Sequence, residues 1–100
     1  MKDFEFADLF DAYGKMLTDL QRSLIEGYYI YDLSYSELAE EHGGSRQSVY
    51  DAIKKARAQL TEYEQNIGIV ALKRKITDLA DEVDSLNHDI SVKLKDLLRG

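Results

Sequence analysis

Apolar side chains recur every three or four residues along most of the chain, and this spacing predicts helices. A first helix is expected over residues 3–13, and Gly14 ends it. Thr18 and Gln21 have the spacing of a capping box, so a second helix is expected over residues 18–31. The apolar side of the first helix is formed by Phe6, Leu9, Phe10 and Tyr13, and that of the second by Leu20, Leu24, Ile25, Tyr28 and Tyr29.

Residues 33–60, LSYSELAEEHGGSRQSVYDAIKKARAQL, predict two helices joined by a tight glycine turn. Ser34 and Glu37 can form a capping box at the start of the first helix. Leu38, Ala39 and His42 share one face of this helix. Gly43 can end this helix, and Ser45 can cap a second helix that runs to about residue 66, where Asn66 and Gly68 are a stop signal. This order of elements is typical of a helix-turn-helix.

The second helix of this motif has two different faces. Val49, Ile53, Ala56, Leu60 and Tyr63 recur at helical spacing and should face a core. The opposite face carries Arg46, Gln47, Tyr50, Asp51, Lys54 and Arg57, with Lys55 beside them. Arg bonds guanine and Gln bonds adenine in a major groove, and the cations further along suit phosphates. The alternative is an ordinary solvated face, which Asp51 favours because its carboxylate repels phosphate.

The turn of the motif departs from the usual pattern. The position after the turn glycine commonly holds a large apolar residue that packs between the two helices, and here it is Gly44. If Gly44 has a negative φ, a branched side chain at this position would fill a gap and stabilise the domain by about 1 kcal/mol.

The C-terminal third carries an apolar stripe with the heptad spacing of a coiled coil. A single helix over residues 69–98 would be roughly 45 Å long at about 1.5 Å per residue. Leaving such an apolar stripe exposed to water is energetically unfavourable, so we expect it to pack against a partner. The a positions are Ile69, Ile76, Val83, Ile90 and Leu97, and the d positions are Leu72, Leu79, Leu86 and Lys93.

Two partners fit this stripe. One is the same helix of a second protomer, and the other is the pair of N-terminal helices, within the chain or across a dimer. No oppositely charged g and e′ residues would pair in a parallel coil, and Leu94 at an e position widens the stripe. We therefore expect a bundle-like homodimer interface, with a fold-back within the chain as the alternative.

Charge is distributed unevenly. The chain has a net charge of −6, yet residues 45–60 carry four Lys or Arg and one Asp, a net charge of +3. The predicted recognition helix is therefore the clearly positive element, whereas residues 1–44 have a net charge of −7 and would repel DNA. No stretch of about 18 apolar residues is present, so we expect no membrane insertion and a cytoplasmic location.

The sequence contains no recognisable motif of a catalytic or metal-binding site. There is no cysteine, and the only histidines, His42 and His88, are far apart in the sequence. The carboxylates at Asp78, Asp81, Glu82 and Asp84 lie around a predicted helix and are best read as a solvated face. We expect no enzyme activity, no metal and no cofactor.

The stretches DAYGKMLTDLQ and SRQSVYDAIKK resemble the YlxM-type helix-turn-helix proteins, over residues 4 to about 68. Residues 17–53 also resemble region four of sigma factors, which reads a promoter element. The resemblance implies an all-helical dimer that regulates transcription, with Ser45, Arg46, Gln47, Tyr50 and Lys54 as DNA-reading candidates. It also implies a link to the signal recognition particle, because the genes commonly neighbour that of its GTPase.

The sequence as a whole predicts an all-α protein with a sigma region four-like helix-turn-helix domain and a long C-terminal amphipathic helix. The expected domain spans residues 1–66, with the motif at 34–60, and residues 67–100 form the dimerisation helix. The expected function is DNA binding and regulation in the signal recognition particle pathway. The alternative is a non-enzymatic adaptor that binds the particle's protein or RNA through the same face.

Overall fold

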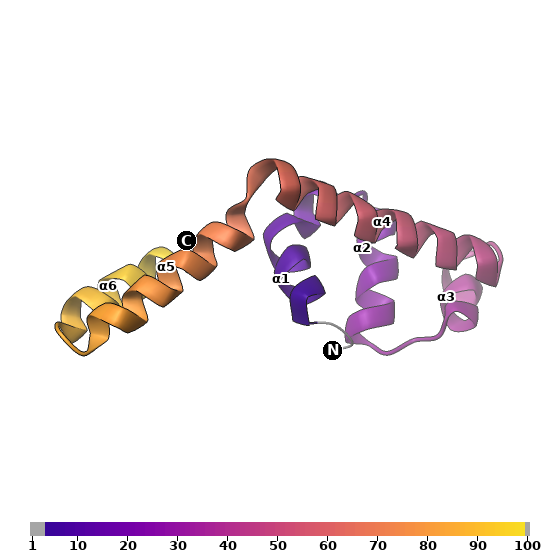
Figure 1. Cartoon of the computed structure of the whole chain (residues 1–100). Coiled ribbons are helices and arrows are strands. Elements are labelled where there is room, and N and C mark those ends of the chain that lie inside the picture. Colours follow the sequence, from indigo (N-terminus) through magenta and orange to yellow (C-terminus); the bar gives the residue numbers. More distant parts are fainter. Residues whose placement is uncertain (1–3, 100) are drawn as a thin grey trace. The chain divides into compact units, whose positions relative to one another are not determined.

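The computed structural model describes residues 4–99, and all its regular elements are helices (Figure 1). The chain divides into two compact units, Met1–Ile67 and Gly68–Gly100. The all-α class predicted from periodicity is confirmed. Residue 3, where the first helix was expected to begin, lies outside the described residues.

The elements of the first unit follow the predicted order. They are α1 (Phe4–Tyr13), the 3₁₀ turn η1 (Gly14–Met16), α2 (Asp19–Ile25), the π-helical turn η2 (Glu26–Ile30), α3 (Tyr35–His42) and α4 (Arg46–Ile67). The expected second helix thus changes to a π-helical turn in its last third, where Tyr31 N–H donates to the Glu26 carbonyl at 3.1 Å.

The expected caps are present. Both predicted capping boxes form: Thr18 with Gln21 at the start of α2, and Ser34 with Glu37 at the start of α3. The Ser45 hydroxyl accepts a hydrogen bond from the Ser48 backbone N–H at 3.0 Å, so Ser45 caps α4 as expected. Caps of this kind satisfy backbone N–H groups that a helix start leaves without partners, and they explain why these helices begin where they do.

The core of the first unit lies on one side of α4, which contacts α1, α2 and α3 (Figure 1). Val49, Ile53, Ala56 and Leu60 are buried on that side, as their spacing predicted, and Tyr63 is half-buried. Burying a Val, Ile or Leu side chain fully contributes about 1.5–3 kcal/mol to the stability of the fold. The opposite side of α4 is therefore held outward by the packing of its neighbours.

Two residues expected on apolar faces are in fact exposed. Leu20 lies on the outer side of α2, with 55% of its surface accessible, and His42 is exposed at the end of α3. At the interface of α2 with α4 a polar contact is found, in which Gln21 donates to the Gln59 side chain at 2.9 Å. Apolar spacing alone did not predict this amide pair.

The turn between α3 and α4 also corrects an expectation. Gly43 and Gly44 both have positive φ, at 87° and 88°. A Cβ at Gly44 would lie 2.8 Å from the Ser48 hydroxyl oxygen, which accepts a hydrogen bond from the Ser45 N–H at 2.9 Å. The assumption of a negative φ is wrong, and a branched residue here would be strained and would disturb the cap.

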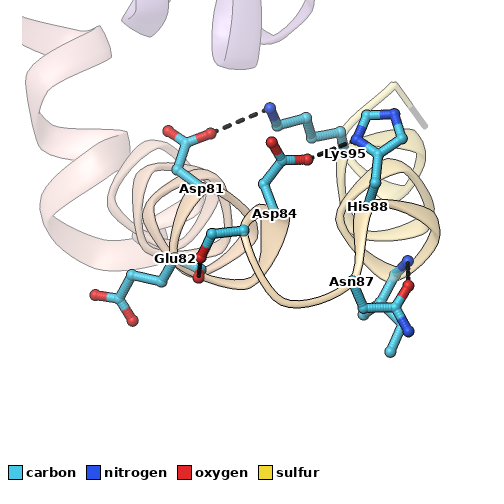
Figure 2. A network of polar contacts seen from close by, with 8 residues as sticks. Asp81, Glu82, Asp84, Asn87, His88 and Lys95 are labelled. Atoms are coloured by element: carbon cyan, nitrogen blue, oxygen red, sulfur yellow. Dashed lines mark hydrogen bonds and ion pairs between the residues drawn. The ribbon is translucent and has the colours of Figure 1, made fainter.

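The second unit is a hairpin of two helices, α5 (Ile69–Asp84) and α6 (His88–Leu97), rather than the single long helix expected. Asn87 causes the break, since its side chain accepts the Ile90 N–H at 3.2 Å and caps α6. Figure 2 shows polar contacts across the hairpin, with Lys95 3.1 Å from Asp81. The His88 ring donates a hydrogen bond to the Asp84 carboxylate, and this contact lowers the pKa of that carboxyl.

The residues that are buried in the second unit are not those of the heptad stripe. The buried residues of this unit have small or short side chains, namely Val70, Ala80 and Ser91. The stripe residues Ile69, Ile76 and Val83 are half-buried, whereas Leu72, Leu79, Leu86, Ile90 and Leu97 are exposed. Folding the hairpin therefore leaves much of the predicted stripe open to solvent.

Gly27 is the first position that we predict to be sensitive. It is buried in η2, and a Cβ added there would lie 2.5 Å from Cδ2 of Leu38, which is fully buried. Gly27→Ala should therefore lower the free energy of unfolding by about 1–3 kcal/mol, the usual cost of overpacking. Urea unfolding measures this, with Ser36→Ala on the exposed side of α3 as control. Equal stability of wild type and Gly27→Ala would contradict the close packing.

Gly44 gives a second prediction. Gly44→Ala should lower the melting temperature, because a side chain at φ of 88° costs about 1–2 kcal/mol. Gly44→Ile should be at least as unstable, since its larger side chain meets the same hydroxyl. Thermal unfolding followed by circular dichroism measures both variants. A higher melting temperature for Gly44→Ile would restore the original expectation of an unfilled gap.

Candidate nucleic-acid interface

The outward side of α4 presents most of the predicted site residues. Arg46, Gln47, Tyr50 and Lys54 are exposed along it, in that order from the start of the helix. These four residues are brought together on one face by helical spacing. Lys55 is also exposed, but it lines neither of the hollows described next.

Two open hollows lie along this face. The first, of about 490 Å³, involves the beginning of α4 and is lined by Tyr35, Arg46, Gln47 and Tyr50. The second, of about 350 Å³, lies further along and is lined by Tyr29, Tyr35, Tyr50, Ile53, Lys54, Arg57, Ala58 and Thr61. Tyr35 and Tyr50 line both, so these two tyrosines form a ridge between the hollows.

The charge of this surface differs from that of the whole chain. Three cations line the two hollows, Arg46, Lys54 and Arg57, and none of the described lining residues is acidic. This contrasts with 19 Asp and Glu in a chain of 100 residues. A third hollow, between α2 and α3, is lined by Glu26, Glu41 and His42 among others. Of these three hollows, the two on the α4 face are therefore the ones that suit a polyanion.

An aromatic cluster supports the ridge. The Tyr28 and Tyr35 rings are stacked, with centroids 4.7 Å apart and an interplanar angle of 9°. Tyr50 meets Tyr35 edge-on, with ring centroids 5.5 Å apart. A hydrogen bond with Tyr28 and burial raise the pKa of Tyr35 to about 12.

Arg57 has a structural contact that the sequence did not reveal. Its guanidinium lies 5.3 Å from the centroid of the Phe6 ring and 5.6 Å from that of Tyr29. These two rings are themselves stacked at 4.3 Å. Cation–π contacts of this kind stabilise packing by about 0.5–2 kcal/mol, so Arg57 links α4 to α1 and η2 as well as lining the second hollow.

Two of the predicted DNA-reading residues, Gln47 and Ser45, form hydrogen bonds with residues of α4. The Gln47 amide donates to the Asp51 carboxylate at 3.0 Å, and the Ser45 hydroxyl caps the helix. The carboxylate predicted to repel phosphate is thus held by Gln47. Gln47 would have to exchange this hydrogen bond to read a base edge.

The sequence analysis missed the contribution of Tyr35 and Tyr29. Both come from the tyrosine-rich stretch YYIYDLSYS at residues 28–36, whose clustered aromatics were a usable signal. Their placement depends on the π-helical turn η2 and on Asp32, which has a positive φ of 56°. Neither feature follows from helical periodicity.

The described part of the chain has neither of two other features, a metal site and a membrane-spanning helix. Residues 4–99 contain no group of His, Asp and Glu side chains arranged to hold a metal ion. None of the helices within that range is long and apolar enough to cross a membrane.

Known proteins with similar sequences support the helix-turn-helix assignment. A family model described as "Putative helix-turn-helix protein, YlxM / p13 like" matches residues 1–97. A UPF0122 protein of Symbiobacterium thermophilum is 45% identical over 84 residues, which cover 83% of this chain and 78% of the relative. A UPF0122 protein of Clostridium kluyveri is 37% identical over 95 residues, which cover 91% and 86%.

A third relative, a UPF0122 protein of Bacillus cereus, is 40% identical over 89 residues, which cover 82% of this chain and 81% of the relative. The resemblance to YlxM-type proteins seen in the sequence is thereby confirmed. The chain belongs to the UPF0122 family of YlxM / p13-like helix-turn-helix proteins.

Proposed function

We propose that the chain is a non-enzymatic DNA-binding protein that places the first half of α4 in a major groove. The observation that carries this proposal is the absence of acidic side chains among the described lining of two hollows that hold Arg46, Lys54 and Arg57. Within the described residues, no ion pair is formed by Arg46 or Lys54. Cations without carboxylate partners can neutralise phosphates at little cost.

The roles of the residues follow from their position along the helix. In a helix-turn-helix the beginning of the second helix reaches base edges, so Arg46 and Gln47 would read sequence. Lys54 and Arg57 lie two to three turns further on and would contact phosphates. We further propose a regulatory role linked to the signal recognition particle, which rests on the family resemblance alone.

A second candidate function uses the same face. The acidic remainder of the chain, with a net charge of −7 over residues 1–44, opposes wrapping by duplex DNA and favours a small contact. An adaptor that docks on the particle's RNA or protein would need only the α4 face. Titration of labelled duplex DNA and of the particle RNA at low salt compares the two candidates directly.

The assembly state is a separate proposal. We propose a homodimer held by the apolar stripe of α5 and α6, since Leu72, Leu79, Leu86 and Leu97 are each at least half exposed. Leu72 and Leu79 lie seven residues apart and therefore share one face of α5, and large apolar side chains exposed on one face mark an interaction site. The hairpin changes the geometry expected of the interface, from two long helices to a bundle of shorter ones.

For the nucleic-acid face, we predict different effects of two substitutions. Arg46→Ala should relax sequence preference and cost roughly 1–3 kcal/mol at the affected base pair. Lys54→Ala should weaken binding to all DNA sequences alike and reduce the slope of log affinity against log salt concentration by about 0.9. Fluorescence anisotropy over a salt series measures both quantities.

Lys55→Ala is the matched control for this prediction, because it removes the same charge from a neighbouring exposed position outside both hollows. Its effect should be smaller than that of Lys54→Ala. Nucleic-acid binding that is undetectable near about 50 mM salt, or unchanged when Arg46 and Lys54 are both replaced, would contradict the proposal.

For the dimer, we predict that Leu79→Glu together with Leu86→Glu gives a monomer that keeps its helices. Both side chains are exposed in the single chain, by 50% and 86%, so charges there should oppose association rather than folding. Sedimentation and circular dichroism measure these two properties. Ala71→Glu adds the same charge at an exposed position off the stripe and should remain dimeric. A monomeric wild type at tens of micromolar would refute the dimer.

A further inference from the structure

We propose that the ridge of Tyr35 and Tyr50 is a stacking site for an unpaired nucleobase. The proposal rests on one part of the proposed function, that the α4 face is a nucleic-acid surface, and it adds an unpaired base to the ligand of that face. The ligand is a strand whose bases are not all paired, such as a loop, an overhang or a single strand.

The position of the two tyrosines supports this assignment. Both line the hollow with Arg46 and Gln47, and both line the hollow with Lys54 and Arg57. A strand lying along the face would therefore meet cations, then two aromatic rings, then cations again. This alternation of stacking rings and positive side chains is typical of surfaces that bind single strands.

The geometry of Tyr50 favours a base that has left a duplex. Inside a duplex the faces of each base are covered by its neighbours, and a protein reaches only the edges in the grooves. Tyr50 is 40% exposed, and its ring stands nearly perpendicular to that of Tyr35, at 79°, so part of its surface remains open. An aromatic surface of this kind can receive the flat face of an unpaired base.

The platform is also held firmly in place. Tyr35 is stacked on Tyr28, Tyr28 meets Tyr29 edge-on at 4.9 Å, and Tyr29 is stacked on Phe6. The π-helical turn η2 supplies Tyr28 and Tyr29 to this row of rings, and π-helical turns often occur at functional sites. A rigid platform loses little conformational entropy when a base stacks on it.

The charge of the surface agrees with this ligand. The phenol of Tyr35, whose pKa is raised further above neutral pH, adds no negative charge to the face. The described lining of both hollows contains no carboxylate that would repel phosphates. The hollows, of about 490 and 350 Å³, are within the size range of sites that hold small flat ligands.

The experiment compares Tyr50→Leu with Tyr50→Phe in the full-length chain. Leucine retains an apolar side chain without a ring, whereas phenylalanine keeps the ring and removes only the hydroxyl. The probes are an oligonucleotide of unpaired thymidines and a blunt duplex of equal length, both labelled and titrated at low salt. A single strand containing 2-aminopurine reports stacking independently of affinity, and thermal unfolding verifies that each variant is folded.

We expect Tyr50→Leu to weaken single-strand binding by about 5- to 150-fold, the usual effect of losing one stacked base. Tyr50→Phe should retain the wild-type affinity and the quenching of 2-aminopurine. Folded Tyr50→Leu protein that binds the single strand as tightly as the wild type would overturn the proposal.

The two proposals fail in different ways. Duplex binding that depends on Arg46 and Lys54, with single-strand binding indifferent to Tyr50, would leave the proposed function standing and overturn the stacking site. Single-strand binding that depends on Tyr50, with no duplex binding at all, would support the stacking site and overturn duplex recognition.

Discussion

The packing of one side of α4 against three preceding helices is the constraint on which the first unit depends. Val49, Ile53, Ala56 and Leu60 are buried on that side, and this fixes the rotation of the helix about its axis. Because the rotation is fixed, Arg46, Tyr50 and Lys54 must face outward. The same packing brings Tyr35 of α3 beside Tyr50, so the core and the candidate interface have one common cause.

Periodicity and capping chemistry predicted most of this unit correctly. Ser34 with Glu37, and Thr18 with Gln21, form the capping boxes that their spacing indicated, and Gly68 ends α4 with a φ of 76°. These signals are local, so a single sequence contains them in full. The buried side of α4 was equally predictable, since burial along a helix repeats with the helical period.

Some errors concern contacts between residues distant in sequence, and others concern local conformations that apolar spacing does not indicate. The cation–π contact of Arg57 with Phe6 joins segments that periodicity treats separately, whereas the π-helical turn η2 is a local departure from the helical period. In the second unit, Asn87 occupied an ordinary heptad position in the sequence, yet its side chain caps α6 and divides the predicted helix in two. Small residues such as Ala80 then form the hairpin contact, and the leucines that defined the stripe remain exposed.

The central claim is that the outward side of α4 is the nucleic-acid surface. Backbone NMR of the full chain, titrated at low salt with a short duplex that carries single-stranded ends, tests it most directly. We predict that the largest changes in chemical shift occur at residues 45–61 and at Tyr35. Changes centred on the acidic hollow of Glu26 and Glu41, or confined to α5 and α6, would contradict it.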